Sequence, residues 1–128
     1  LEKHEKNTKE VINFLMKQKK IIEILYPYKK KSKNYKNWKK YYSGATGLLG
    51  LVIKSKSKSS VFKFINSLEL FGIGYSWGGF ESLAVYQDIQ REFKKYKDKN
   101  LHIVRLHIGL EDPKDLIFDL KNSLKHIK

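Results

Sequence analysis

The chain has 128 residues, 41% of them hydrophobic and 13% aromatic, and a formal net charge of +14 at pH 7. This length and composition suit one globular domain with a modest core and exclude a disordered polymer. The absence of cysteine excludes disulfides and sulfur-ligated metal sites, and no apolar run reaches the roughly 18–20 residues of a membrane helix. Because the first residues are charged, unlike those of a signal peptide, we expect a cytoplasmic protein.

The first third of the chain predicts two helices separated by a strand. Residues 21–26 are a β-branched run ended by Pro27, which indicates a strand. The polar stretch 29–34 is expected to be a loop, and a short helix is plausible over 35–42. An amphipathic helix is predicted from residue 1 to about 20, because one stripe recurs at three- and four-residue steps and two more apolar residues widen it: Leu1, His4, Thr8, Val11 and Leu15, with Ile12 and Met16.

Residues 29–42 also contain lysines and aromatic residues that could serve an alternative function, nucleic-acid binding, which the positive charge suggests. Almost all the positive charge is lysine, with Arg91 and Arg105 as the only arginines, and the lysines accompany many Ile, Asn and Tyr residues, as in proteins from A+T-rich genomes. Nucleic-acid sites usually employ arginine, so we interpret the lysines as a solvated coat and expect no specific nucleic-acid partner. The alternative is a basic nucleic-acid-binding module that interleaves lysines with aromatic rings: Lys29, Lys30, Lys31, Tyr35, Trp38, Lys39 and Lys40.

The middle of the chain predicts another strand and another helix. Glycines at 44–47 interrupt the chain, and residues 48–54 follow as an apolar strand. The serine- and lysine-rich stretch 55–60 is a predicted loop that supplies a serine N-cap to the next helix. That helix has one apolar stripe, and Gly72 is expected to end it; the stripe is Val61, Phe64, Ile65 and Leu68.

The end of the chain predicts a third strand and a last helix. Along residues 101–108 the odd positions share one face and the even positions the other. Asp112 is the expected cap of the last helix, with Pro113 at its first position; its buried stripe is Leu116, Leu120, Leu124 and Ile127, with Ile117 beside it. We therefore predict an α+β fold for residues 1–128 as a single domain, with helices packed on one face of a mostly antiparallel sheet.

Chemistry could lie first in the glycine-rich segment 71–82. Four glycines within eight residues indicate unusual backbone angles or close approach of another group. Tyr75, Ser76 and Trp77 add two hydroxyls and an indole N–H. A tight turn with an aromatic plug explains the segment equally well. A phosphate-binding loop is disfavoured, because no lysine follows the glycines and no strand clearly precedes them.

Arg105 is the second place where chemistry could lie, since it interrupts an apolar strand in a chain that otherwise uses lysine. Its planar guanidinium matches a carboxylate with two parallel hydrogen bonds, which lysine cannot do. The alternative is a structural ion pair with Glu111 or Asp115. His102 and His107 lie close by in the sequence, but no third ligand joins them, so no metal site is expected and the two rings are expected to be packed or exposed.

Three blocks in the sequence resemble one known family. Residues 38–47 (WKKYYSGATG), 72–82 (GIGYSWGGFES) and 104–112 (VRLHIGLED) occur in this order and at a spacing similar to that in the C-terminal domain of the cystathionine β-lyases. These lyases belong to the Cys/Met-metabolism group of pyridoxal-phosphate enzymes. The resemblance runs from the first predicted helix to the last.

The resemblance implies roles for particular residues. The serine-glycine-glycine-x-glutamate-serine core is widely shared in the group, whereas Tyr75 and Trp77 around Ser76 look like the β-lyase branch. By this resemblance Arg105 would bind the substrate α-carboxylate and Trp77 would support that carboxylate. Ser76 would be the catalytic serine, near the Schiff-base lysine, and Tyr75 would face the distal end of a cystathionine-like substrate.

The same resemblance implies that the larger, cofactor-holding domain of the enzyme is missing from this sequence. In the family a larger N-terminal domain holds pyridoxal phosphate and supplies the Schiff-base lysine, and its motifs do not occur here. We therefore expect a truncated lyase that starts in mid-helix, has no cofactor-binding residues, binds no cofactor alone and is inactive as an isolated chain. Surfaces that normally meet the missing domain are expected to cause self-association, mainly through the first helix.

Overall fold

In the described part of the chain, five strands form one sheet, which carries most of the positions discussed below. In the computed structural model, which describes residues 1–88 and 98–128, the strand order is β1-β2-β5-β4-β3. Neighbouring strands are antiparallel except β3 and β4, which are parallel. The strands are β1 (Ile21–Leu25), β2 (Leu48–Lys54), β3 (Gly72–Ile73), β4 (Leu83–Gln87) and β5 (Leu101–His107).

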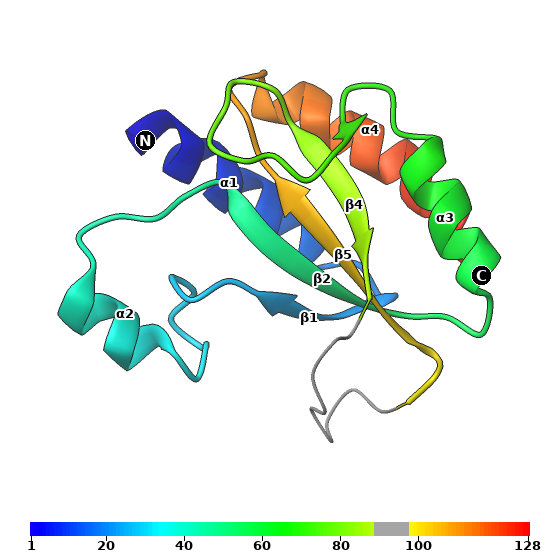
Figure 1. Cartoon of the computed structure of the whole chain (residues 1–128), viewed down its shortest axis with the longest axis horizontal. Helices are drawn as coiled ribbons and strands as arrows, with labels where there is room; N and C mark the ends of the chain where they lie inside the picture. The colour runs from blue at the N-terminus through cyan, green and yellow to red at the C-terminus, as the bar shows by residue number, and fades with distance from the viewer. Residues whose placement is uncertain (89–97) are drawn as a thin grey trace.

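Four helices accompany the sheet in the described chain: α1 (Glu2–Leu15), α2 (Tyr35–Tyr41), α3 (Lys58–Asn66) and α4 (Pro113–Leu124). Helix α4 packs against α1 and α3, and α3 also contacts β4. Figure 1 shows α2 standing apart from the other helices, beyond the end of β1. The α+β architecture with a mostly antiparallel sheet is the one that the sequence predicts.

The hydrophobic core lies between the sheet and the three packed helices. On β5 the even positions Val104 and Leu106 are fully buried, as are Leu51 and Ile53 on β2. They form one cluster with apolar residues of α1, α3 and α4. Each fully buried side chain of this size contributes about 1.5–3 kcal/mol. The odd positions of β5, including Arg105, therefore lie on the opposite face, outside this core.

The predicted helix caps are confirmed. The Ser57 side chain accepts a hydrogen bond from the Ser60 N–H, and the Asp112 side chain accepts one from the Lys114 N–H, with Pro113 in the first turn. Each interaction satisfies one of the N–H groups that a helix leaves unpaired at its start. No helix in the described ranges is long and apolar enough to cross a membrane.

Several predicted boundaries are wrong. Helix α1 ends at Leu15 rather than near residue 20, and two turn hydrogen bonds follow it, from Lys17 and Gln18. Helix α3 ends at Asn66, so Gly72 does not terminate it. Gly72 instead begins β3, which pairs with β4, and neither of these strands was predicted.

Candidate functional site

Arg105 stands near the middle of the sheet, on the face that the helices leave open. In register it lies between Gly50 on β2 and Val85 on β4. The Leu25 side chain of β1 fills the space beside Gly50, where a methyl group would lie 3.3 Å from the Leu25 Cβ. The side chain is half-buried, which suits a cation that must remain reachable by a ligand.

The guanidinium of Arg105 reaches the glycine-rich segment. One terminal nitrogen, Nη2, donates a hydrogen bond to the Tyr75 carbonyl. The central guanidinium carbon lies 5.7 Å from the centre of the Tyr75 ring, within the range of a cation–π contact. Neither Glu111 nor Asp115 forms an ion pair with Arg105 in the described part of the chain, so the structural ion pair considered from the sequence is not observed.

The segment from residue 74 to 81 presents its aromatic rings to solvent. Tyr75, Trp77 and Phe80 are 66%, 63% and 69% exposed, and Ser76 between the first two is also exposed. Gly78 has a φ of +83°, which residues with a side chain rarely adopt. The segment is therefore an outward-facing loop rather than an aromatic plug, and it depends on glycine at position 78.

A carboxylate fastens the end of this loop to the segment after β5. The Glu111 side chain accepts hydrogen bonds from the Ser82 N–H at 2.8 Å and the Ser82 hydroxyl at 2.7 Å. The same hydroxyl accepts a bond from the Gly109 N–H at 2.8 Å. A methyl group on Gly109 would lie 2.2 Å from the Phe80 carbonyl oxygen, so only glycine fits there. The second and third sequence blocks are thus bound directly to each other.

The first block joins the same assembly. The Ile108 N–H donates to the Gly47 carbonyl at 2.8 Å. A methyl group on Gly47 would lie 2.2 Å from the Ile108 carbonyl oxygen. The order and spacing of the three blocks in the sequence therefore correspond to three loops that meet at one end of β2, β4 and β5.

Helix α1 connects all three loops through its polar side chains, which the sequence analysis missed. The Asn7 amide donates to the carbonyls of Gly109 and Glu111 at 3.2 and 3.0 Å. Glu5 accepts a bond from the Ala45 N–H at 3.0 Å. His4 contacts the Gly79 carbonyl at 2.9 Å. The apolar periodicity of α1 indicates only its core face, so these contacts could not be read from the pattern.

The hydrogen bond from the Lys9 ammonium to Glu5 is 2.7 Å long. Together with the smaller effect of the Ala45 N–H, and against the opposing effect of burial, it holds the pKa of the Glu5 carboxyl below its ordinary value. Glu5 is therefore a carboxylate that serves both its own helix and the loop at residues 44–47.

The two histidines of β5 occupy opposite faces of the sheet. His102, on the core face, contacts the Tyr86 hydroxyl and the Ser55 carbonyl, each at 3.0 Å. His107 contacts the Gly79 carbonyl at 3.1 Å. Both rings are almost fully buried. Among residues 1–88 and 98–128, no group of three potential ligands could hold a metal ion.

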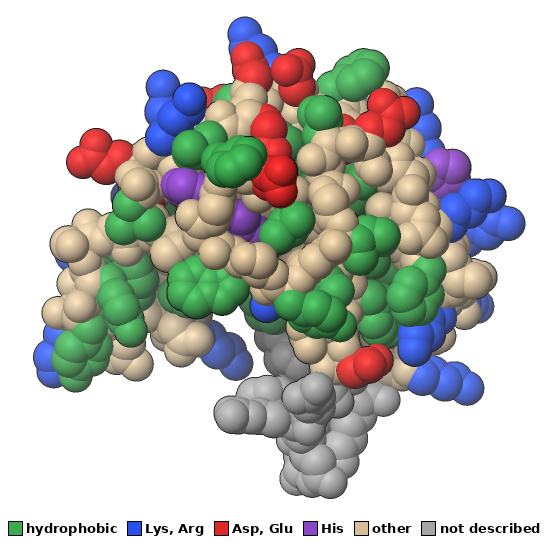
Figure 2. All heavy atoms as spheres, turned by 45° about the horizontal axis from the view of Figure 1, so that its top comes forward, with side chains coloured by type: hydrophobic (Ala, Val, Ile, Leu, Met, Phe, Trp, Pro, Cys, Tyr) green, Lys and Arg blue, Asp and Glu red, His purple; other side chains and the backbone are tan. Residues whose placement is uncertain are grey.

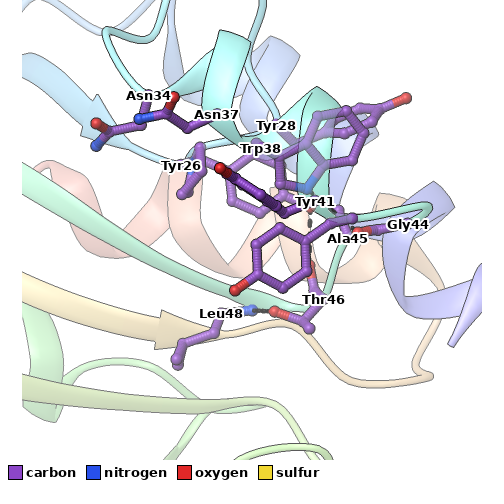
Figure 3. Close-up of a pocket in the computed structure, with 12 residues that line it drawn as sticks. Tyr26, Tyr28, Asn34, Asn37, Trp38, Tyr41, Gly44, Ala45, Thr46 and Leu48 are labelled. Atoms are coloured by element: carbon purple, nitrogen blue, oxygen red, sulfur yellow. Dashed lines mark hydrogen bonds between the residues drawn. The ribbon is translucent and has the colours of Figure 1, made fainter.

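The residues of the nucleic-acid alternative lie elsewhere, around α2. Trp38 stacks on Tyr35 with ring centres 5.7 Å apart and meets the edge of Tyr28 at 4.5 Å. Trp38 and Tyr28 also help to line a cavity of about 400 Å³ between α2 and residues 44–48 (Figure 3). The Trp38 indole N–H donates to the Gly44 carbonyl at 3.2 Å. Trp38 is therefore engaged inside the chain rather than free to stack on bases.

The sequence model of the "Cys/Met metabolism PLP-dependent enzyme" family matches residues 1–125. The chain belongs to this family. The match includes all three loops and α1, so the contacts described above lie within the part of the chain that matches the family.

Individual relatives support the same assignment. A cystathionine beta-lyase of Bordetella avium is 36% identical over 94% of this chain and 31% of its own length. An L-alanine/L-glutamate racemase of Wolbachia pipientis is 31% identical over 99% of this chain and 32% of its own length. The chain thus spans about a third of the curated relatives that it matches, and it resembles their C-terminal domain.

A solved structure of a putative O-acetylhomoserine (thiol)-lyase from Campylobacter jejuni has the same fold. It superimposes with a TM-score of 0.76 and 30% sequence identity, over 96% of this chain and 28% of that protein. That structure contains an N'-pyridoxyl-lysine-5'-monophosphate. The family therefore uses pyridoxal phosphate, and its members catalyse different reactions on amino acids.

The open sheet face offers the Arg105 guanidinium, in contact with Tyr75, and the next two residues of the loop, Ser76 and Trp77, are exposed. One cation with a flanking hydroxyl and indole suits a single carboxylate. A cofactor phosphate and a pyridine nitrogen need several backbone N–H donors and an acidic partner, which this set does not provide. The arrangement therefore suits an anionic group better than the phosphate or pyridine nitrogen of a cofactor.

Proposed function

We propose that this chain is the domain that binds the substrate carboxylate in a pyridoxal-phosphate-dependent cystathionine β-lyase. Such an enzyme cleaves cystathionine to homocysteine, pyruvate and ammonia. The observation that carries the proposal is the position of Arg105: it is half-buried on the open sheet face, next to Tyr75, and forms no ion pair with a carboxylate of the described chain. A half-buried cation without an anion is costly, which favours an external anionic ligand.

In this proposal Arg105 binds the α-carboxylate of the amino acid through two parallel hydrogen bonds. The existing bond to the Tyr75 carbonyl uses one donor of the guanidinium and fixes its plane, leaving further N–H groups for the ligand. Holding the carboxylate sets the direction of the Cα–H bond that must be broken. Trp77 shields this interaction from water, which strengthens it.

Ser76 and Tyr75 complete the proposed substrate side. Ser76 lies between the two aromatic residues on the exposed loop, where its hydroxyl can position the proton-transferring amine of the complete enzyme. Tyr75 extends toward the distal, sulfur-bearing end of cystathionine. Pyridoxal phosphate, held by the part of the enzyme outside this chain, would supply the electron sink for the reaction at Cα.

The choice of β-lyase over the other reactions of the family rests on Tyr75 and Trp77, which look like the β-lyase branch. A hybrid enzyme tests it: this chain replaces the matching C-terminal region of the Bordetella avium cystathionine beta-lyase. We expect the hybrid enzyme to release pyruvate and homocysteine from cystathionine. Release of 2-oxobutanoate and cysteine would instead indicate γ-elimination, and interconversion of alanine enantiomers without pyruvate would indicate a racemase; either result would contradict the proposal.

A further inference from the structure

Two histidines from distant parts of the chain contact the same backbone oxygen. His4 on α1 and His107 at the end of β5 place their Nε2 atoms 2.9 and 3.1 Å from the Gly79 carbonyl oxygen. Their ring centres are 5.6 Å apart. A carbonyl oxygen has two lone pairs and can accept both hydrogen bonds.

This geometry determines where the ring protons lie. Because a carbonyl only accepts, both Nε2 atoms must carry the hydrogen and donate. Both Nδ1 atoms are buried and have no hydrogen-bond partner in the described structure. A buried nitrogen without a partner lowers stability, so an apolar side chain at either position would pack at less cost. The presence of histidine at both positions is better explained by the hydrogen bonds that the two Nε2 atoms donate to the Gly79 carbonyl.

The hydrogen bonds to the Gly79 carbonyl hold the exposed loop in place near its end. This carbonyl follows Gly78, a residue whose lack of a Cβ gives the backbone unusual conformational freedom, and it lies two residues after Trp77. Between residues 75 and 79, the other described hydrogen bond is the one from Arg105 to the Tyr75 carbonyl. The orientation of Ser76 and Trp77 is therefore set by two attachments, Arg105 at the start of the loop and the histidine pair at its end.

We propose that His4 and His107 are positioning residues that hold the Gly79 carbonyl and thereby fix Ser76 and Trp77 beside Arg105. Neither imidazole needs to touch substrate. The catalytic consequence rests on the proposed lyase function, whereas the structural consequence does not: loss of either N–H donor releases the loop while the sheet and core remain.

The chain offers an internal control for a spectroscopic test, because Trp38 and Trp77 are its two tryptophans. With 5-fluorotryptophan incorporated in the whole chain, ¹⁹F NMR gives one signal for each, assigned with Trp38→Phe. We expect His4→Leu and His107→Leu to shift and sharpen the Trp77 signal and to leave the Trp38 signal in place. His4→Gln keeps an N–H donor at similar reach and should return the Trp77 signal most of the way to its original position.

His102→Leu is the matched control, since His102 is equally buried on the same strand but bonds to Tyr86 and Ser55 on the other face. It should lower thermal stability without moving the Trp77 signal. An unchanged Trp77 signal in both His4→Leu and His107→Leu would overturn the proposal. So would an equal change in His102→Leu, because general loosening would then explain the effect.

The hybrid enzyme supplies the functional measurement. We expect His4→Leu to raise KM for cystathionine and lower kcat/KM about tenfold or more, with His4→Gln recovering most of the loss. Unchanged kinetics alongside a mobile Trp77 would show that the loop is held for folding alone and would refute the positioning role. A parent hybrid without lyase activity would contradict only the proposed function, and the NMR result would then decide whether the histidines hold the loop.

Discussion

Arg105 is the residue on which the proposed function depends most directly. Lysine in its place would keep the charge but lose the planar pair of donors. In the hybrid enzyme we expect Arg105→Lys to lower kcat/KM by about ten- to a hundredfold, mainly through KM, since a charge-assisted bond contributes roughly 1.5–3 kcal/mol. Arg105→Ala should be worse, because the bound carboxylate then has no partner.

Fold stability supplies the control for Arg105. In the described chain its side chain bonds to the Tyr75 carbonyl, on the face away from the core. Both substitutions should therefore change the unfolding free energy of the isolated chain by less than about 1 kcal/mol. Clear destabilisation of the chain by Arg105→Lys, together with normal kinetics in the hybrid enzyme, would show that Arg105 is structural.

Substitution of Gly109, unlike substitution of Arg105, is expected to lower the stability of the fold. A methyl group on Gly109 would lie 2.2 Å from the Phe80 carbonyl oxygen and 2.6 Å from a carboxylate oxygen of Glu111. Because one obstacle is backbone, the loops must separate, and Gly109→Ala should destabilise the chain by about 2–4 kcal/mol in urea titration. Gly79→Ala is the comparison, since a methyl group there meets nothing within 4 Å. Equal stability of Gly109→Ala and the unchanged chain would mean that the loops do not pack as described.

From the sequence, candidate site residues could be selected only where a local signal marks them. Arg105, Tyr75, Ser76 and Trp77 could be selected because an unusual residue type or a cluster of glycines marks them, and the structure brings Arg105 and Tyr75 into contact. Their roles in substrate binding remain predictions. His4 could not be selected, because its partner is 75 residues away and its helical periodicity assigns it to an apolar stripe.

Among the elements, helix α1 both forms hydrogen bonds to the loops and packs over the core. Glu5 provides a test, because its pKa is held below the ordinary glutamate value of 4.5. A carboxyl with a lowered pKa contributes stability above that ordinary value, and the contribution disappears as the pH falls through the folded-state pKa.

We therefore expect Glu5→Gln to lower the unfolding free energy by about 1 kcal/mol at pH 7. The difference between the two proteins should shrink toward zero as the protonated Glu5 comes to resemble glutamine, below pH 4.5. Urea denaturation across this pH range measures it. Glu2→Gln, an exposed glutamate of the same helix, should show a much smaller difference at pH 7. A constant difference at all pH values would contradict the role of the Glu5 charge.

The elements that the sequence failed to predict share a physical cause. Strand β3 has two residues and forms only by pairing with β4. Strand β4 directly follows the glycine-rich loop, where local signals favour turns. Its pairing partner β5 is not adjacent to it in the sequence. Both strands are stabilised by partners distant in sequence, whereas β2, β5 and α4 have long apolar patterns or caps of their own and were predicted correctly.

For self-association of the whole molecule, the distribution of apolar and charged side chains over the surface matters more than the net charge. Figure 2 shows lysine and arginine side chains mainly around the rim of the face in view, with hydrophobic side chains across its middle. The apolar stripe of α1 is already buried in the core, with Val11 and Leu15 fully covered. This leaves α1 a poorer contact for self-association than its sequence pattern predicts.

The exposed apolar side chains of the glycine-rich loop are a better contact between two copies of the chain. Trp77 and Phe80 are both more than half exposed, and they carry no charge to oppose burial. The net charge of +14 opposes the approach of a second copy, but salt screens it, since the Debye length falls to about 10 Å at 0.1 M. We therefore expect a monomer at low salt and a growing dimer fraction as salt is raised.

Sedimentation velocity from low to high salt measures this, with a double variant, Trp77→Ser and Phe80→Ser, expected to remain monomeric. Met16→Ser on α1, also exposed, is the matched control and should associate like the unchanged chain. The sign of the salt dependence separates this from the nucleic-acid alternative, because binding of single-stranded DNA by the lysines around α2 would weaken with salt. A strict monomer at every salt concentration would contradict the loop contact, and tight DNA binding with a steep salt slope would favour the alternative.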